Sequence, residues 1–303
     1  MVGAAPRRDR TMSGWLAIVN PAAGRRGEAD HAVRELAGRF RLAPAIETTT
    51  APGHATELAR GAAEFHGIVA VGGDGTVAEV LAGMDIARQR LAVIPAGHGN
   101  CLARDLGFTR PRDAVAALER GHARPIDLMQ VGIDFGDGRT ESRWAASTVA
   151  VGYVCDVVRN GLRLSWLGRR AYETAAAITI PRALGARIAL LDGAQMLPGL
   201  TGIVINNTAH LANFRAFAGA RFDDGQLEVM ENAARWPRQM LHNAAVLAGS
   251  RAFGPARMRQ STRATVTLER AGRLMVDGEI LEGVTRVTVI CHCSAVACIG
   301  EAR

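Results

Sequence analysis

A glycine-rich stretch with one acidic side chain is the first candidate for chemistry. Residues 72–76 are Gly-Gly-Asp-Gly-Thr, with an apolar run before them at 68–71 and apolar residues at helical spacing after them. A strand that turns through glycines into a helix directs backbone N–H groups and partial positive charge to one point, which suits phosphate. Asp74 would repel a phosphate unless a metal ion or a proton transfer lies between them. The stretch therefore predicts a nucleotide phosphate site with Mg²⁺.

Repeated strand–turn–helix units would position this stretch. Short apolar runs predict strands at 15–19, 68–71 and 91–94, and a further strand is expected around 45–49; each is followed by a turn and a helical pattern. Such repetition predicts an α/β fold with a right-handed, doubly wound parallel sheet. Ligands bind at the carboxyl edge of such sheets, where we expect the turns at 20–24, 49–53, 72–76 and 95–100 to meet.

The sequence pattern changes near residue 127. Asp-Gly turns and two helical stretches, roughly 153–184 and 236–249, then separate segments of strand character at 128–135, 143–151, 186–191, 201–206, 226–230, 262–269, 272–276 and 284–291. We therefore expect a nucleotide-binding α/β domain over residues 1–126 and a second, mostly antiparallel β-domain over 127–291. The tail, about 292–303, is expected to pack back on the first domain.

Composition excludes several kinds of chemistry. All 36 residues counted as Lys+Arg are arginine, which a GC-rich genome would explain; without lysine there is no Walker A loop, protein-kinase lysine or Schiff base. The net charge of +7 suits anionic substrates, an anionic membrane surface or nucleic acid, but few aromatics and no zinc-finger or RNA-binding signature argue against nucleic acid. We predict a cytoplasmic protein, because no long apolar run or signal peptide is evident and the five cysteines are scattered.

Five motifs occur together in a specific order. They are Asn-Pro-Ala-Ala-Gly (20–24), Gly-Gly-Asp-Gly-Thr (72–76), Pro-Ala-Gly-His-Gly-Asn (95–100), Asp-Asp-Gly-Gln-Leu (223–227) and Asp-Gly-Glu (277–279). In this combination the chain resembles the diacylglycerol kinase catalytic-domain family, which includes bacterial lipid kinases and the sphingosine and ceramide kinases. The resemblance covers nearly the whole chain. Gly-Gly-Asp-Gly-Thr alone is shared with NAD kinases and 6-phosphofructokinases, so it is the full set that indicates the lipid-kinase branch.

The resemblance implies a role for each motif. Asp74 would lie near the catalytic metal, and Glu279 would accept the proton with Asp277 beside it. A structural Mg²⁺ would be held by the Asp224 side chain and main-chain carbonyls of Arg221 and Gln226. The residues expected at the nucleotide are Asn20, Gly24, Thr49 (or Thr48 or Thr50 in its place), Gly72, Gly73, Asp74, Gly75, Thr76, Glu79, His98 and Asn100.

The chemistry of phosphoryl transfer supports these roles independently. It needs positioned phosphates, Mg²⁺ to spread charge, and a carboxylate to take the hydroxyl proton. Glu279 can act in this way if burial raises its pKa toward neutrality. Simpler explanations stay open, because residues 277–279 would also suit a hairpin turn with a solvated glutamate, and residues 223–225 a plain turn.

The chain departs from the family pattern at one motif. The family usually has Pro-x-Gly-Thr-x-Asn-Asp, whereas residues 95–101 place His98 at the threonine position and Cys101 at the final aspartate. Histidine can still donate a hydrogen bond to phosphate, so ATP binding remains the expectation. Cys101 is either a reactive thiol or, more simply, a cysteine that packs a helix.

Two further features have competing interpretations. Cys291, His292, Cys293 and Cys298 suggest either zinc or strand packing; one cluster lacks the second ligand pair typical of structural zinc, which favours packing. Residues 159–170 mix leucines and a tryptophan with four arginines, which suits either an anionic membrane surface or an ordinary solvated helix.

These observations predict an ATP- and Mg²⁺-dependent lipid kinase, peripherally associated with the membrane that holds its lipid substrate. The expected acceptor is a primary hydroxyl of diacylglycerol by default, or of ceramide or a sphingoid base. Two rivals are a kinase for a soluble acceptor such as NAD and a non-catalytic, nucleotide-sensing membrane adaptor. The sequence leaves a homodimer open and identifies neither the lipid nor the oligomeric state.

Overall fold

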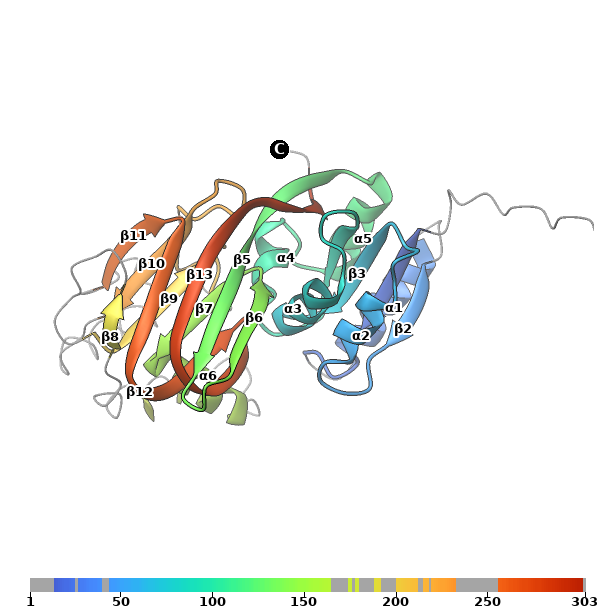
Figure 1. Cartoon of the computed structure of the whole chain (residues 1–303). Helices are drawn as coiled ribbons and strands as arrows, with labels where there is room; N and C mark the ends of the chain where they lie inside the picture. Colours follow the sequence, from blue (N-terminus) through green and yellow to red (C-terminus); the bar gives the residue numbers. More distant parts are fainter. Residues whose placement is uncertain are drawn as a thin grey trace, which may run out of the picture. The chain divides into compact units, whose positions relative to one another are not determined.

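The computed structural model describes residues 14–24, 27–39, 44–164, 174–175, 178–179, 188–191, 200–211, 215–217, 219–232 and 256–301 (Figure 1). Its contacts divide the chain into two compact units. The first unit contains residues 1–126, 212–214 and 294–303, and the second contains residues 127–211 and 215–293. The two boundaries that lie in described residues fall inside strands β5 (Ala123–Phe135) and β13 (Glu279–Ile299).

The first unit is built on a parallel sheet. Its strands are β1 (Trp15–Val19), β2 (Ala45–Thr48), β3 (Gly67–Gly72) and β4 (Arg90–Pro95), in the order β2-β1-β3-β4. The C-terminal end of β13 adds a further parallel strand beside β4, through Ala297 and Cys298. The order of the strands is that of a doubly wound sheet, as the four strand–turn–helix units predict.

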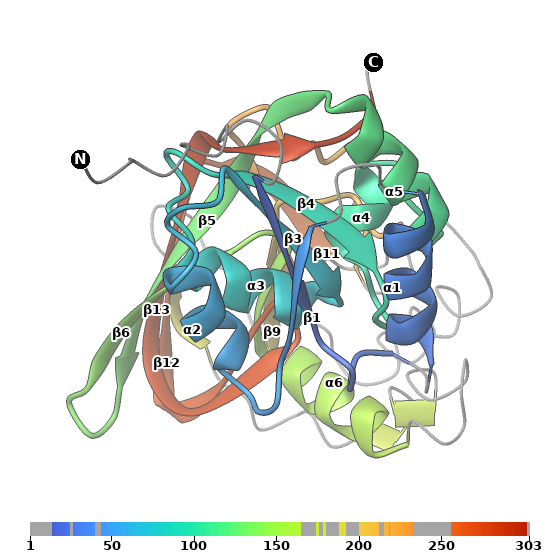
Figure 2. The same cartoon turned by 90° about the vertical axis from the view of Figure 1, so that its right-hand side faces the viewer.

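Helices cover both faces of this sheet. Helices α1 (Glu28–Arg39) and α5 (Pro111–Arg120) pack together on one face, while α2 (His54–Arg60) and α3 (Asp74–Gly83) pack together on the other (Figure 2). A short helix, α4 (Cys101–Asp105), follows β4. Strands covered on both faces carry apolar side chains throughout, which is why every residue of β1 and β3 is buried.

The second unit is mostly antiparallel. Its strand order is β11-β10-β9-β7-β12-β13-β5-β6, with β8 beside β12, and the pairs β5–β6, β7–β9, β7–β12, β9–β10, β10–β11 and β12–β13 are antiparallel. Besides β5 and β13, the elements are β6 (Thr140–Ala145), β7 (Thr148–Gly152), α6 (Tyr153–Arg163), β8 (Ile188–Leu191), β9 (Gly202–Asn206), β10 (Leu227–Asn232), β11 (Ala256–Ser261) and β12 (Arg263–Val276).

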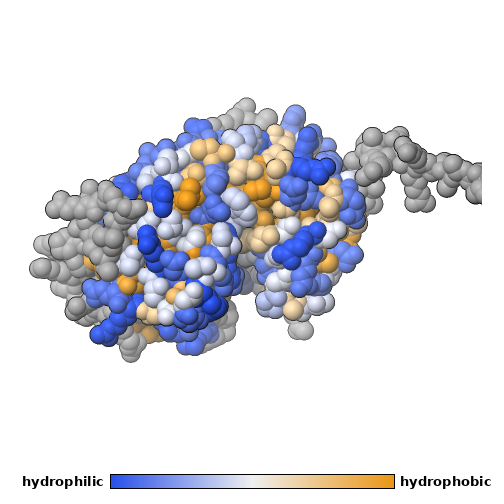
Figure 3. All heavy atoms as spheres, viewed as in Figure 1, coloured by the Kyte–Doolittle hydropathy of each residue, from blue (hydrophilic) through white to orange (hydrophobic). Residues whose placement is uncertain are grey.

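Alternation along these strands separates a core from a solvated face. Val131, Ile133, Ile205 and Val229 are among the apolar side chains that form the main buried cluster of this unit. The outward face of β5, β6 and β13 carries hydrophilic residues interspersed with single hydrophobic ones (Figure 3). This pattern is the one that period-2 alternation predicts for antiparallel strands.

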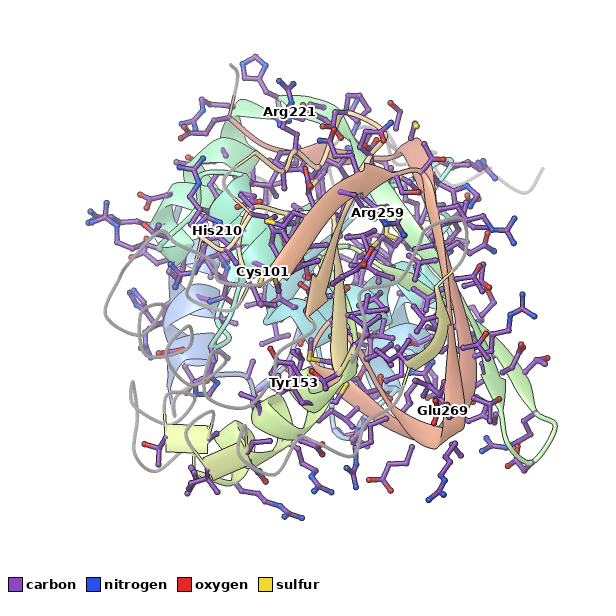
Figure 4. The ribbon with its side chains drawn as sticks, turned by 90° about the vertical axis from the view of Figure 1, so that its left-hand side faces the viewer. Cys101, Tyr153, His210, Arg221, Arg259 and Glu269 are labelled. Carbon is purple, nitrogen blue, oxygen red and sulfur yellow. The ribbon has the colours of Figure 1, made fainter. Side chains whose placement is uncertain are left out.

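Glu231 is one of three buried acidic side chains among the described residues of the second unit, with Asp127 and Asp277. Glu231 on β10 has a fully buried side chain, and its Oε1 accepts a hydrogen bond at 3.1 Å from Nε of Arg259 on β11. Arg259 is labelled in Figure 4. Glu231 follows Leu227 and Val229 on the same face of β10, so the pair lies at the margin of the apolar cluster. A buried charge is tolerated only when it is paired, and Arg259 supplies the pair.

The structure differs from the sequence-based expectations in several elements. The predicted strand 143–151 is two strands, because the chain turns away at Ala146 and Ser147 and directs three backbone N–H groups to one carboxylate. Helix α2 ends at Arg60 rather than near residue 65, and neither α5 nor β11 is predicted by the sequence pattern. The helical stretch predicted at 236–249 lies outside the described residues. Residues 165–170 of the segment 159–170 lie outside them too. Within the described part of the chain, no helix is long and apolar enough to cross a membrane.

Candidate active site

The glycine turn after β3 is closed by Thr76. A Cβ added to Gly72 would lie 2.3 Å from Oγ1 of Thr76, so only glycine lets the strand approach the helix this closely. Thr76 is buried, and its Oγ1 accepts a hydrogen bond from Nδ2 of Asn20 at 3.1 Å. Gly73 is the N-cap of α3 and has no side chain that could cap the helix. The N-terminus of α3, which includes the exposed Gly75, therefore has no side-chain cap. This is the arrangement that favours an anion.

Asp74 joins this turn to the next one. Its Oδ1 accepts a hydrogen bond of 2.8 Å from the backbone N–H of Cys101, the first residue of α4. A carboxylate at a helix N-terminus is stabilised by the helix dipole. Cys101 itself is buried, in agreement with the helix-packing interpretation. A metal-side role for Asp74 remains a prediction, and the structure shows that one oxygen already has a structural partner.

The turn after β4 is braced by Asn100. This residue has a left-handed backbone with φ of 53°, its Oδ1 accepts the N–H of Gly97 at 2.9 Å, and its Nδ2 donates to the Gly97 carbonyl at 2.7 Å. Gly97 packs against Gly73 so closely that a Cβ on Gly97 would lie 2.4 Å from the Gly73 Cα. His98 is exposed on the same turn. The turns after β3 and β4 therefore lie in direct contact.

The turn after β1 meets the same place. Asn20 Oδ1 accepts the N–H of Ala22 at 3.0 Å, while its Nδ2 reaches Thr76. Gly24 has φ of 65°, and a Cβ there would lie 2.1 Å from the carbonyl oxygen of Ala96. The structure thus brings three glycine-containing turns to the carboxyl edge of the parallel sheet, as predicted for such folds.

Thr49 and Glu79 lie at the margin of this group. Thr49 is largely buried at the end of β2, and its N–H bonds to the Val19 carbonyl at 2.8 Å. Glu79 Oε2 accepts the N–H of Ala55 at 3.2 Å, and its backbone carbonyl accepts the hydroxyl of Thr56 at 2.9 Å. Glu79 therefore caps the N-terminus of α2. Its expected place near the nucleotide stays a prediction.

The second unit holds the Asp-Gly-Glu motif. Asp277 and Gly278, with φ of 45° and 92°, are the two central residues of the tight β12–β13 hairpin, in which Val276 pairs with Glu279. Positive φ at both central positions is characteristic of a type I′ turn, for which Asp-Gly is a favoured sequence. The sequence-based expectation of a turn here agrees with the structure.

Asp277 is buried and fully engaged. Its two oxygens accept the backbone N–H groups of Ala146, Ser147 and Thr148 and the Ser147 hydroxyl, at 2.7–3.0 Å. Burial raises the pKa of Asp277, and the hydrogen bonds from these four donors act in the opposite direction. With four donors on its two oxygens, this buried carboxylate anchors the hairpin to the β6–β7 connection, and this geometry favours a structural role over a proton-accepting one.

Glu279, in contrast, is exposed. Its side chain is 55% accessible, and Oε2 forms an ion pair with Nη1 of Arg143 at 2.8 Å. The burial expected for a proton-accepting glutamate is therefore absent from this unit as it stands. Arg143 also contacts Glu141. Burial opposes the charge of Arg143, but hydrogen bonds to Glu279 and Glu141 outweigh it and raise the pKa of the guanidinium.

The Asp-Asp-Gly-Gln-Leu loop has the oxygen ligands expected for Mg²⁺. Asp224 is exposed and its Oδ1 accepts the N–H of Gln226 at 3.0 Å, while Arg221 pairs with Asp223 at 3.2 Å. One carboxylate and main-chain carbonyls form a hard, oxygen-only donor set, so the residues fit the ion. No group of three or more His, Cys, Asp or Glu side chains in the described residues has metal-binding geometry, so any site here depends on carbonyls.

Sequence reasoning missed the residues that hold these motifs. Asp127 is buried, and its Oδ2 accepts the N–H of Gly225 at 2.6 Å. This hydrogen bond holds the Asp-Asp-Gly-Gln-Leu loop in place. Asn207 is buried and donates to the carbonyls of Asp127 and Ala146, which links this loop to the Asp277 anchor. An isolated aspartate at the predicted domain boundary was the only available signal for Asp127, and for Asn207 and Arg143 there was none.

The Cys291–Cys293 segment packs as a strand. Cys291 is half-buried and Cys293 exposed on β13, and burial, together with the nearby Asp127 carboxylate, raises the pKa of Cys291 to about 12. His292 faces the other side, where it hydrogen-bonds Gln130 at 2.9 Å and stacks edge-on against Trp144. The alternative of strand packing rather than zinc agrees with this arrangement.

The fold and the converging turns define a class: a protein with a phosphate-type site at the carboxyl edge of a doubly wound sheet and a second, antiparallel unit. Residues 14–131 match the family model described as the diacylglycerol kinase catalytic domain. The resemblance is therefore confirmed over this segment, which contains three of the five motifs and carries that domain.

Curated relatives carry lipid-kinase names. A diacylglycerol kinase of Bacillus subtilis is 41% identical over 124 residues, which is 38% of this chain and 40% of the relative. A diacylglycerol kinase of Mycobacterium tuberculosis is 31% identical over 176 residues, 54% of this chain and 53% of the relative. Sphingosine kinase B of Dictyostelium discoideum is 28% identical over 123 residues, 37% of this chain and 16% of the relative. The chain therefore aligns with between 16% and 53% of the length of these relatives.

Solved structures confirm the fold over nearly the whole chain. A Bacillus anthracis protein matches with a TM-score of 0.75 at 20% identity, covering 96% of this chain and 98% of the other. A second structure from the same organism, described as a diacylglycerol kinase, gives a TM-score of 0.68 at 19% identity with the same coverage. The expected combination of a doubly wound α/β unit and a β-rich unit is thus confirmed.

Proposed function

We propose that this protein is an ATP- and Mg²⁺-dependent lipid kinase that phosphorylates a primary hydroxyl of a membrane lipid, with diacylglycerol as the default acceptor. The observation that carries the proposal is the convergence of the three turns that follow β1, β3 and β4. Direct contacts between Asn20 and Thr76, between Gly73 and Gly97, and between Asp74 and Cys101 hold them together.

Backbone N–H groups replace lysine at the phosphates in this proposal. The uncapped N-terminus of α3 offers N–H groups and partial positive charge next to Gly73 and Gly75. The exposed His98 adds a donor from the neighbouring turn. This arrangement suits the polyphosphate of ATP in a chain whose basic residues are all arginine.

Mg²⁺ would supply charge neutralisation on the transferring phosphoryl group. In the second unit, Asp224 with the main-chain carbonyls of Arg221 and Gln226 would hold a structural ion, and Asp74 is proposed beside the catalytic ion. The chemistry of these ligands, all oxygens, supports the assignment.

Glu279 is the proposed proton acceptor. As the acceptor hydroxyl oxygen bonds to the γ-phosphorus and the bond from that phosphorus to ADP breaks, the hydroxyl proton passes to the Glu279 carboxylate. Its exposure leaves it open to a substrate hydroxyl, whereas Asp277 holds the hairpin in place. Exposure in the free protein does not prevent this role, because catalytic hydrogen bonds often tighten only in the bound complex.

The acceptor is proposed to lie in an anionic membrane surface, which the net charge of +7 would attract. Relatives named sphingosine kinases keep ceramide and sphingoid bases as the alternative acceptors. A peripheral location at the cytoplasmic face of a membrane would follow from either substrate.

The test is phosphoryl transfer from labelled ATP to diacylglycerol, ceramide and sphingosine in mixed vesicles, with NAD as a soluble acceptor, in Mg²⁺ and in EDTA. Glu279→Gln should lower the rate by about 100-fold or more, and Glu282→Gln, an exposed glutamate on the same strand, should not change it. Transfer to NAD without vesicles would instead support the soluble-acceptor kinase. Tight ATP binding without any product would support the non-catalytic adaptor, and undiminished Glu279→Gln activity would overturn the assigned base.

A further inference from the structure

Arg143 lies between two carboxylates on the surface of the second unit. Its Nη1 contacts Oε2 of Glu279 at 2.8 Å, while Nε and Nη2 contact Oε2 of Glu141 at 3.1 and 2.9 Å. One guanidinium therefore serves the candidate base and a second acid at the same time. Arg139 approaches the other oxygen of Glu141 at 3.6 Å and does not join the contact with Glu279.

Regular structure fixes both ends of this contact. Glu141 and Arg143 are two residues apart on β6, so their side chains lie on the same face, and β6 is held by pairing with β5. Glu279 begins β13 directly after the type I′ turn, which the buried Asp277 anchors with four hydrogen bonds. The pair thus joins two rigid supports 136 residues apart in sequence.

Stability alone is a poor explanation for the contact. The side chains of Arg143 and Glu279 are 29% and 55% exposed, and ion pairs at such sites contribute little to folding because water and salt screen them. The geometry has a clearer consequence for Glu279. A cation in direct contact favours the ionised form of a carboxylate and fixes the direction in which its oxygens point.

We propose that Arg143 is a positioning residue for the proton acceptor Glu279. Glu141 weakens the contact between Arg143 and Glu279 because it binds the same guanidinium. This inference rests on the proposed lipid-kinase function for its catalytic meaning. Arg143 keeps Glu279 ionised and oriented before the substrate arrives. Glu141 draws part of the positive charge away, so that Glu279 retains enough basicity to accept a proton.

The charged groups that face Glu279 determine the expected signs. Arg143 on β6 favours its ionised form directly, Glu141 on β6 weakens that effect, and Arg139 acts only through Glu141. Asp277, two residues earlier in the hairpin, is turned inward to its own donors. Removing Arg143 should therefore disfavour the ionised form of Glu279, and removing the charge of Glu141 should favour it.

The activity test is the pH profile of kcat for the wild-type protein and the variants Arg143→Gln, Glu141→Gln and Arg139→Gln, with the best lipid of the panel. Arg143→Gln should move the acidic limb to higher pH, so that the rate on that limb falls roughly tenfold for each pH unit of displacement. Glu141→Gln should move the limb to lower pH, and Arg139→Gln should leave it in place. Arg143→Lys, which keeps the charge but not the two-sided contact, should restore the limb only in part.

A second measurement is independent of turnover. The side-chain carboxyl of Glu279, identified by its loss in Glu279→Gln, is titrated by carbon-13 NMR in the same variants. Shifts of opposite sign in Arg143→Gln and Glu141→Gln support the inference even if every lipid proves inactive, in which case the proposed function fails separately. An unchanged Glu279 titration in Arg143→Gln, or shifts of the same sign in both variants, overturns it.

Discussion

Two carboxylates with proposed roles, one in each unit, have opposite environments. Asp74 accepts the backbone N–H of Cys101 and so holds two turns together, whereas Glu279 is exposed and paired with Arg143. The position where the related family usually has a second aspartate is the buried Cys101, which contributes its N–H instead of a carboxylate. In the turns after β3 and β4, residues 72–76 and 95–101, only Asp74 is acidic, and that concentrates the proposed metal-side role on it.

Asp74 can be tested by separating its hydrogen bond from its charge. Asp74→Asn keeps an oxygen that can accept the Cys101 N–H, but it loses the negative charge that a metal ion needs. We expect thermal stability close to that of the wild-type protein and phosphoryl transfer lower by on the order of 100-fold. Asp74→Ala removes both the hydrogen-bond acceptor and the charge, so thermal stability and phosphoryl transfer should both fall. Full activity of Asp74→Asn in the ATP assay would show that the residue serves only to join the turns.

The Asp-Gly-Glu motif should separate stability from activity. Asp277→Asn places an amide donor where four donors already converge, so the free energy of unfolding should fall by about 1–3 kcal/mol. Glu279→Gln alters an exposed side chain and should change it by less than about 1 kcal/mol. Urea denaturation measures both. Equal losses in the two variants would contradict the assignment of Asp277 as the anchor and Glu279 as the solvent-facing acid.

At the level of elements, the close approach of two glycine turns forms the site. A Cβ on Gly97 would lie 2.4 Å from the Gly73 Cα, so Gly97→Ala must force the turns apart. We expect a loss of about 1–3 kcal/mol in unfolding free energy and weaker ATP binding by calorimetry. Gly38→Ala in α1, where an added Cβ meets nothing, should stabilise the helix by about 0.5–1 kcal/mol and leave ATP binding unchanged. Equal ATP affinities in the two variants would refute a role for this contact.

Local pattern predicted the elements where it matched the tertiary structure. Strands β1, β3 and β4 are almost wholly apolar and lead into glycine-containing turns, so their existence follows from the sequence, whereas the residues of β2 are exposed. The predicted strand at 143–151 was wrong as a single strand, because Asp277, more than 120 residues away, takes the N–H groups of residues 146–148. The same long-range chemistry explains why Arg143 was missed. No local sequence pattern indicates which arginine on a solvated strand will contact a glutamate that is distant in sequence.

At the level of the whole chain, each unit contains part of the five-motif set. The three nucleotide motifs lie in the first unit, and the Asp-Asp-Gly-Gln-Leu and Asp-Gly-Glu motifs lie in the second. Motif order could therefore predict which residues matter. It could not predict their supports, such as Asp127 under Gly225 or Arg143 beside Glu279, which arise from pairing of strands distant in sequence.

The chain's C-terminal strand completes the first unit, and truncation should show it. Residues 294–303 belong to that unit, Ala297 and Cys298 pair with β4, and Val296, Cys298 and Ile299 are buried. Removing residues 294–303 exposes the edge of β4 and takes away the burial of those side chains, at about 1.5–3 kcal/mol for each large apolar one. That loss is a large fraction of the roughly 5–15 kcal/mol that stabilises a typical domain. Denaturant unfolding and protease digestion should therefore show early unfolding of β1–β4. Unaltered unfolding after this truncation would mean that the four strands are stable without their C-terminal neighbour.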